Sequence, residues 1–279
     1  MAINKKNLAQ RAVTVVFTLA ILAVVVLLLP KWYMHLVLAV IGLLGVMEFD
    51  RMANGFGYRV YKIPVMLFIL LGIGSIYLPW FNLLMLPYLS FAMVCLISLV
   101  PPSDFTKSLP QLGISIMATG YLALSLVSLA YIYLLEDASG KDMGRILICF
   151  CLLMTWVGDI TAFFAGSLFG KHKIAPKASP NKTWEGTAGN LVGNYIAAYV
   201  AKVTVLPQLD QWDLIFFTLV FGLLGFWGDL VESTWKRGAR MKDSGTMLPG
   251  HGGFLDRTDS IFLTAPVFYY YMKTVVLAG

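Results

Sequence analysis

Long apolar runs alternate with short polar segments along the whole chain. Because about 20 apolar residues cross the hydrocarbon core of a bilayer, this pattern predicts an all-α, polytopic integral membrane protein with about nine transmembrane helices. The expected spans are residues 13–30, 32–49, 63–79, 81–100, 112–135, 146–169, 186–205, 212–231 and 259–277. Lys5, Lys6 and Arg11 precede the first span, and no small-residue cleavage site follows it, so we expect an uncleaved anchor.

The basic residues between the spans predict the orientation. With a cytoplasmic N-terminus, most of the 21 Lys and Arg residues lie on the cytoplasmic side, as the positive-inside rule requires. The positive charge is spread over short segments between helices, which argues against a nucleic-acid partner. Both long charged segments then face the cytoplasm.

Composition supports a membrane protein. The chain is 58% hydrophobic and 13% charged, whereas soluble domains average about 25% charged residues. Its three cysteines, Cys95, Cys149 and Cys151, lie in apolar runs, which argues against a disulfide framework. By expected role, we divide the chain into residues 1–145, a membrane scaffold with a lipid-accessible cavity, and residues 146–279, which carry the catalytic segments.

One charged segment, residues 229–259, stands out near the C-terminus. It contains five acids, five bases and His251, together with several glycines; the charged residues are Asp229, Glu232, Asp243, Asp256, Asp259, Lys236, Arg237, Arg240, Lys242 and Arg257. Mg²⁺ binds carboxylates and phosphates, basic side chains neutralise phosphates, and glycines let backbone N–H groups approach an anion. This mixture is typical of a site for a metal-bound polyphosphate. The alternative is a solvated loop whose acids favour a helix N-terminus.

Helical spacing suggests how these acids meet. Asp229, Glu232 and Ser233 share one helix face at the end of the eighth span, and Asp256 and Asp259 share a face at the start of the ninth. If the two helices pack together, their acids converge on one divalent cation at the cytoplasmic boundary.

Two further acids lie in or beside apolar runs. Asp159 lies inside the sixth span, where a carboxylate costs about 2.5 to 3.5 kcal/mol, so we favour a metal or substrate role over a structural hydrogen bond to a neighbouring helix. Glu48, at the end of the second span, is expected to be an interfacial residue paired with a neighbouring Arg or Lys, and a role in a substrate channel is the alternative.

A second charged segment, residues 170–186, is rich in lysine. It offers hydrogen-bond donors for a phosphate or an anionic lipid headgroup, namely Lys171, Lys173, Lys177, Ser179, Asn181, Lys182 and Thr183. The spacing of its glycines does not match a P-loop. A polybasic segment attracted to anionic lipids is the alternative interpretation.

Thirteen residues of the C-terminal segment follow the order and spacing of the phosphatidate cytidylyltransferase signature: Ser233, Lys236, Arg237, Lys242, Asp243, Gly245, Pro249, His251, Gly252, Gly253, Asp256, Arg257 and Asp259. The chain thus resembles the CDP-diacylglycerol synthase family. Residues 179–186 look like the second common motif of that family. Trp235 and Phe163 depart from it, since the family usually has an aliphatic residue or Phe at the first position and often Tyr at the second.

The resemblance implies an enzyme that transfers CMP from CTP to phosphatidic acid, giving CDP-diacylglycerol and pyrophosphate. It also implies Mg²⁺, with room for a second cation, and a homodimer in the bacterial cytoplasmic membrane with its active site facing the cytoplasm. The expected catalytic residues are Asp229, Asp256, Lys242 and His251. The expected substrate-binding residues are Ser179, Lys182, Thr183, Ser233, Lys236, Arg237 and Arg257. The expected metal ligands are Asp229, Asp256, Asp259 and Asp243, and Asp159 and Glu232 are further candidates.

Three other functions are weighed against this one. A CTP-dependent polyprenol kinase would transfer the γ-phosphate to an alcohol, so the fate of a labelled α-phosphate distinguishes it. A secondary transporter would explain Asp159 but predicts functional charge near the membrane midplane, whereas most acids here cluster at one face. A structural membrane protein with a polybasic segment leaves the thirteen matched positions unexplained.

Overall fold

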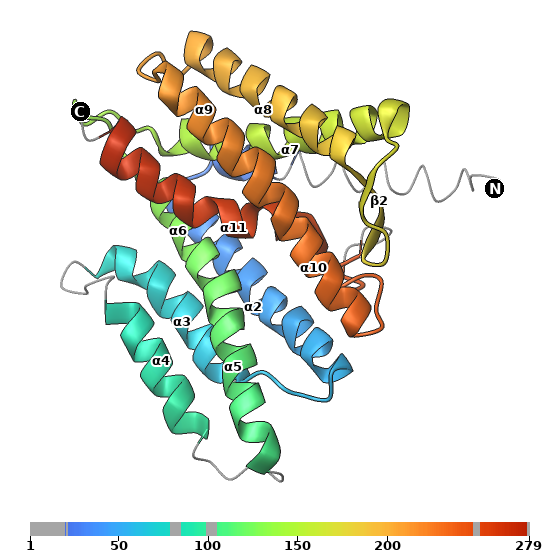
Figure 1. Cartoon of the computed structure of the whole chain (residues 1–279). Coiled ribbons are helices and arrows are strands. Elements are labelled where there is room, and N and C mark those ends of the chain that lie inside the picture. Colours follow the sequence, from blue (N-terminus) through green and yellow to red (C-terminus); the bar gives the residue numbers. More distant parts are fainter. Residues whose placement is uncertain (1–19, 21, 79–84, 99–104, 248–251, 278–279) are drawn as a thin grey trace. The chain divides into compact units, whose positions relative to one another are not determined.

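The computed structural model describes residues 20, 22–78, 85–98, 105–247 and 252–277, and this part of the chain is mostly helical (Figure 1). Its α-helices are α2 (Lys31–Gly55), α3 (Lys62–Gly74), α4 (Met85–Ser98), α5 (Ser108–Ala118), α6 (Leu124–Ile132), α7 (Gly144–Phe169), α8 (Trp184–Thr204), α9 (Gln211–Leu219), α10 (Phe226–Gly238) and α11 (Leu255–Tyr271). Wider helical turns join α5 to α6 (Thr119–Ala123) and α9 to α10 (Val220–Gly225), and another extends α11 (Met272–Val276). Short 3₁₀ turns cover Ser75–Tyr77 and Phe105–Lys107. Strands β1 (Lys173–Ala175) and β2 (Ser179–Thr183) form one antiparallel hairpin.

The helices confirm the predicted class of fold. Each predicted span from residue 32 onward contains a helix, and the first predicted span lies mostly outside the described residues. Four helical stretches in the described part are long and apolar enough to cross a membrane: Lys31–Gly55, Phe105–Ile132, Gly144–Phe169 and Gln211–Gly238. The protein is therefore a helical membrane protein, while the number of nine spans and the cytoplasmic N-terminus stay predictions.

The chain divides by packing into two compact units. The first unit comprises residues 1–130 and 238–258, and the second comprises residues 131–237 and 259–279. The division at residue 145 that we drew from the sequence follows expected role rather than packing, and it stays a prediction.

In the first unit, α2 packs against α3 through small and branched side chains. A Cβ atom on Gly42 would lie 2.8 Å from Ile69, so the absent side chain lets the two helices approach closely. The turn from α2 to α3 is closed by Asp50, which accepts the N–H of Val60 at 3.0 Å and pairs with Lys62 at 3.0 Å. Buried hydrogen bonds thus fix the end of α2, where the second predicted span meets its polar segment.

In the second unit, α7 runs beside α8 (Figure 1). A Cβ atom on Gly158 of α7 would lie 2.5 Å from the side-chain nitrogen of Asn194 on α8, so the helices meet at a position without a side chain. The rings of Phe150, Phe217 and Phe268 contact one another with centroids 5.3 to 5.8 Å apart, which joins α7, α9 and α11. This aromatic core supports the helices that carry the charged segments of this unit.

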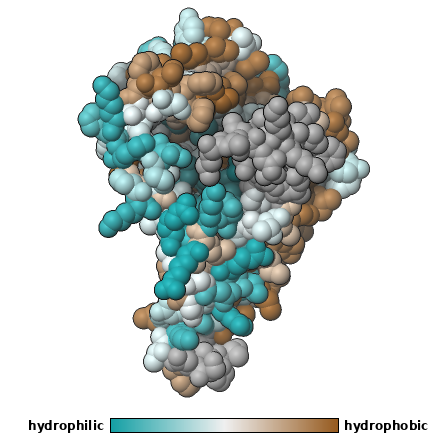
Figure 2. All heavy atoms as spheres, turned by 90° about the vertical axis from the view of Figure 1, so that its right-hand side faces the viewer, coloured by the Kyte–Doolittle hydropathy of each residue, from teal (hydrophilic) through white to brown (hydrophobic). Residues whose placement is uncertain are grey.

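The surface separates polar and apolar side chains. Figure 2 shows hydrophilic side chains gathered on one face, with hydrophobic side chains beside them. In the second unit, the segment around the hairpin exposes Lys171, Lys173 and Lys177, whereas α7 exposes Phe164 and Leu168. Exposed apolar helix surface next to exposed lysines is typical of a chain that passes from the bilayer into water at this point.

Candidate functional site

The lysine-rich segment folds as the β-hairpin and the first turn of α8. Lys173 lies opposite Thr183 and Ala175 opposite Ser179 in the antiparallel pair. Thr183 has an extended backbone, and its side-chain oxygen accepts the N–H of Gly186 at 3.1 Å, which caps α8. Thr183 is buried in this position. The residues that resemble the second family motif therefore build a rigid junction between strand and helix.

The hairpin lies beside α10 (Figure 1), and Lys182 holds it there. The ammonium nitrogen of Lys182 lies 2.7 Å from a carboxylate oxygen of Asp229 and donates to the carbonyl oxygen of Phe226 at 3.1 Å. It also lies 4.3 Å from the centre of the Phe226 ring. In a second contact the donor lies on α10: Arg237 donates to the carbonyl oxygen of Ala178 in the hairpin turn at 3.3 Å. The structure thus brings the two predicted phosphate-binding segments together within the second unit.

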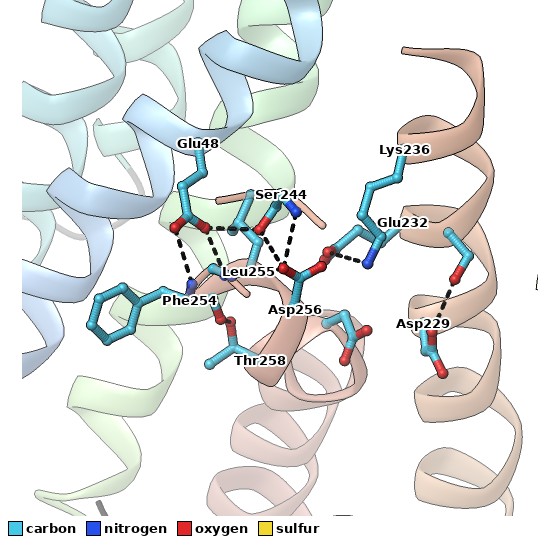
Figure 3. A network of polar contacts seen from close by, with 12 residues as sticks. Glu48, Asp229, Glu232, Lys236, Ser244, Phe254, Leu255, Asp256 and Thr258 are labelled. Carbon is cyan, nitrogen blue, oxygen red and sulfur yellow. Dashed lines mark hydrogen bonds and ion pairs between the residues drawn. The ribbon is translucent and has the colours of Figure 1, made fainter. Parts of the chain in front are cut away.

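The polar face of α10 follows the predicted helical spacing. Ser233 donates its hydroxyl hydrogen to Asp229 at 3.2 Å, one turn away. Glu232 is fully buried and forms an ion pair with Lys236 at 3.2 Å, also one turn away (Figure 3). The Asp229 side chain is 36% exposed. Asp229 is therefore open to a ligand, whereas Glu232 is enclosed with its lysine.

Helix α11 packs against α10 at the level of these acids. A Cβ atom on Gly228 would lie 2.5 Å from the carbonyl oxygen of Asp259, so the glycine permits close contact between the backbones. The buried carboxylate of Asp259 is repelled by the carboxylates of Asp229 and Glu232 and attracted by the ammonium group of Lys236. Three acids therefore lie within electrostatic range of one another in the second unit.

Glu48 has a different role from the one expected. It is 2% exposed, and its carboxylate accepts hydrogen bonds from the Ser244 hydroxyl at 2.9 Å and from the N–H groups of Phe254 and Leu255 at 3.1 and 3.0 Å. The prediction of an interfacial ion pair for Glu48 is wrong. No local pattern reveals this role, because its partners, a hydroxyl and two backbone N–H groups, lie about 200 positions further along the chain.

Asp256 is held in the same way, in the first turn of α11. One of its carboxylate oxygens accepts the N–H groups of Gly253 at 2.7 Å and Ser244 at 2.9 Å, and it lies 3.0 Å from the Ser244 hydroxyl (Figure 3). Gly252 has φ of 82°, a backbone conformation that favours glycine. These hydrogen bonds hold the Asp256 carboxylate in one orientation.

Two signature glycines pack against Glu48. A Cβ atom on Gly245 or on Gly253 would overlap the Glu48 carboxylate, so both positions require bare backbone. The sequence predicted that glycines here allow an anion to approach the backbone. In the first unit, the anion that makes this approach is Glu48 itself.

Comparison with known proteins shows the family. Residues 9–275 match the sequence model of the Cytidylyltransferase family. The chain belongs to this family. It is 37% identical over 202 residues to a phosphatidate cytidylyltransferase of Staphylococcus saprophyticus, covering 71% of this chain and 75% of that protein. It is 27% identical over 289 residues to one of Haemophilus influenzae, covering 95% and 98%. It is 34% identical over 189 residues to one of Staphylococcus aureus, covering 68% and 70%. The chain is therefore a nucleotidyltransferase.

The remaining predicted site residues of this cytidylyltransferase differ in their exposure. Lys242, Asp243 and Arg257 are exposed, and Asp159 is exposed on α7. His251 lies outside the described residues. Ser179 opens β2 and is half-buried.

The metal-ligand set of the cytidylyltransferase stays a prediction. Within the described residues, no group of three or more His, Cys, Asp or Glu side chains is arranged to hold a metal ion. Of the four expected ligands, Asp229 and Asp259 belong to the second unit, and Asp243 and Asp256 belong to the first.

A separate hydrogen bond holds the start of the hairpin of the cytidylyltransferase against α8. The His172 ring lies 2.7 Å from a carboxylate oxygen of Glu185 in the first turn of α8. Hydrogen bonds from the backbone N–H of Glu185 and from the His172 ring lower the pKa of Glu185 to about 2. Glu185 is therefore ionised at neutral pH, where it favours the N-terminus of α8 and holds the start of the hairpin.

Proposed function

We propose that this cytidylyltransferase transfers CMP from CTP to phosphatidic acid, giving CDP-diacylglycerol and pyrophosphate. The observation that carries the proposal is the contact of Lys182 with Asp229, which joins a lysine-rich hairpin to an acidic helix face at 2.7 Å. This arrangement offers both a cation for phosphate and a carboxylate for a phosphate-bound metal. The names of the relatives support the choice of phosphatidic acid as acceptor.

The reaction needs no covalent enzyme intermediate. A phosphate oxygen of phosphatidic acid attacks the α-phosphorus of CTP, the bond from that phosphorus to the bridging oxygen breaks, and pyrophosphate leaves with the bonding electron pair. Lys182, Arg237 and Lys242 neutralise phosphate charge, and Ser179 and Arg257 contribute further donors. Lys182 exchanges the carboxylate of Asp229 for a phosphate oxygen when the substrates bind.

The donor chemistry of the acids fits Mg²⁺. Carboxylate oxygens are ligands that Mg²⁺ prefers, and the ion usually takes one or two of them together with substrate phosphates, so a larger acidic cluster is not required. Asp229 and Asp256 are the principal ligands in this proposal, with Asp259 and Asp243 assisting. Asp229 and Asp256 would hold the ion, which would supply positive charge to offset that of the phosphates. A second cation and a catalytic contribution of His251 belong to the same proposal.

We place the enzyme in the bacterial cytoplasmic membrane as a homodimer, with the N-terminus and both charged segments in the cytoplasm. The distribution of basic residues between the predicted spans supports this orientation. The relatives compared here are bacterial, which supports the choice of membrane.

The test uses the full chain in detergent with phosphatidic acid and CTP labelled at the α-phosphate. We expect the label in the lipid product, pyrophosphate release that requires Mg²⁺, and weaker activity with ATP, GTP or UTP. Transfer of a γ-phosphate label to a polyprenol, with no α-label in lipid, would instead support the kinase and refute the proposal.

A further inference from the structure

The buried carboxylate of Glu48 has no part in the reaction described above, yet it contacts Ser244 and the segment at the start of α11 at three points. One of its oxygens accepts the N–H of Phe254, and the other accepts the N–H of Leu255 and the hydroxyl hydrogen of Ser244. We propose that Glu48 is a positioning residue that fixes this segment and, through Ser244, orients the carboxylate of Asp256. This inference rests on the proposed function for the role of Asp256 in CMP transfer.

Ser244 connects the two acids. Its hydroxyl oxygen lies 2.9 Å from Glu48 and 3.0 Å from Asp256, and its backbone N–H donates to the same oxygen of Asp256 at 2.9 Å (Figure 3). A hydroxyl group has one hydrogen, so it donates to one carboxylate at a time. Any shift of Ser244 away from Glu48 therefore disturbs two contacts that hold Asp256.

Glu48 also stabilises the start of α11. The first N–H groups of a helix have no partners within the helix, and a negative charge beside them is favourable. Glu48 supplies a separate oxygen for each of two such groups, at 3.1 Å for Phe254 and 3.0 Å for Leu255. Glutamine has the same shape but only one acceptor oxygen, so it cannot serve both groups.

Bare backbone surrounds the Glu48 carboxylate closely. The backbone at Gly245 and Gly253 is so close to its carboxylate that a Cβ atom at either position would overlap it. The residue is 2% exposed. Water is therefore poorly placed to replace the lost acceptor when Glu48 is changed.

Asp50 provides a matched control on the same helix. It is 7% exposed, accepts the N–H of Val60 at 3.0 Å and pairs with Lys62 at 3.0 Å, so it also holds a distant segment through a buried carboxylate. It makes no described contact with Ser244 or Asp256. A purely structural role for Glu48 predicts equal effects of Glu48→Gln and Asp50→Asn on turnover.

The experiment compares Glu48→Gln, Ser244→Ala, the double variant and Asp50→Asn in the full chain in detergent. Hydrogen exchange is measured at the amides of Phe254 and Leu255 and at Val60, and kcat and KM for CTP are measured in parallel. We expect Glu48→Gln to speed exchange at Phe254 or Leu255 by about tenfold or more, and Asp50→Asn to do so only at Val60. We expect kcat to fall about 30-fold in Glu48→Gln with KM for CTP within about threefold, because the transition state rather than nucleotide binding is affected.

The double variant tests the connection through Ser244. If Glu48 acts through Ser244, the two changes share one effect, and the double variant loses no more kcat than about the larger single loss. Multiplication of the two losses would overturn the proposal, as would unchanged exchange at Phe254 and Leu255 or a loss of kcat no greater than in Asp50→Asn.

If Glu48→Gln does not fold, Ser244→Ala tests the proposal alone. This variant removes only a hydroxyl group, and full retention of kcat would refute the proposal. A wild type that forms no CDP-diacylglycerol, combined with the expected exchange pattern, refutes the proposed function and still supports the positioning of the segment by Glu48.

Discussion

Glu48 and Asp256 in the first unit accept hydrogen bonds from a hydroxyl and from backbone N–H groups, whereas Asp229 and Glu232 in the second unit pair with lysines. A backbone N–H is fixed by the fold and stays beside its acceptor. A lysine is flexible and can move to another anion when one arrives. The comparison indicates that Glu48 and Asp256 are held in a fixed orientation, while the partly exposed pair of Lys182 and Asp229 can rearrange around a phosphate.

The largest expected effect comes from Asp256→Asn. Asparagine retains one oxygen that can accept the N–H groups of Ser244 and Gly253, so the fold is kept, but it lacks the charge that a metal-bound triphosphate needs. We expect CMP transfer to fall by about a thousandfold or more, with an unfolding midpoint close to that of the wild type. Full CTP-dependent activity in the folded variant would remove Asp256 from the proposed metal site.

A large effect on stability is expected from Lys236→Met. The change removes the lysine that pairs at 3.2 Å with Glu232, which has no exposed surface, and breaking a buried ion pair in this way costs about 3 to 5 kcal/mol. In the double variant Glu232→Gln, Lys236→Met, the free energy of unfolding in detergent should return most of the way to the wild-type value. Lys242→Met changes an exposed lysine of the same signature and should leave the stability unchanged. A stable single variant would contradict the view that this pair is structural.

The sequence predicted the elements that depend on local periodicity. Apolar runs located the helices, although α2 and α10 extend six and seven residues beyond the ends of their predicted spans, and helical spacing placed Asp229, Glu232 and Ser233 on one face of α10. The β-hairpin was not predicted, because its strands have three and five residues and are polar, and their position depends on the contact with α10. Strands this short and polar have no alternation of apolar and polar residues that would predict them.

Glu48 shows a second limit of the sequence. The glycines at 245 and 253 indicate that something approaches the backbone closely, but they do not identify it. The group that approaches is a carboxylate from α2, brought there by packing of residues far apart in the chain. Contacts between side chains and distant backbone groups have no spacing in the sequence, so they become visible only in the structure.

A smaller effect on activity is expected from Lys182→Met. The variant removes the cation that contacts Asp229 and the Phe226 ring, so we expect kcat/KM for CTP to fall by about a hundredfold. Lys182→Arg keeps the charge and should retain more activity than Lys182→Met. Lys177→Met changes an exposed lysine in the turn of the same hairpin and should stay within about twofold of the wild type. Equal losses in the Lys182 and Lys177 variants would mean that the hairpin acts through its overall charge, as a polybasic segment does, and not through the exchangeable pair.

The smallest effect is expected from Glu185→Gln, and its pH dependence is specific. The folded-state pKa of Glu185 is about 2, below the ordinary value of about 4.3, so ionised Glu185 stabilises the fold above pH 4.3 and this contribution is lost as the pH falls towards 2. The difference between the unfolding midpoints of the wild type and the variant should therefore be small and constant from pH 6 to pH 8. It should disappear as the pH falls from about 4.5 to 2. The difference is small because the pair of Glu185 and His172 is accessible to solvent and screened by salt. Activity should stay within about twofold, since the pair anchors the hairpin without contacting Asp229. A loss as large as that of Lys182→Met would show that the hairpin works as a rigid support, like the fixed acids of the first unit, and would remove the distinction between fixed and exchangeable partners.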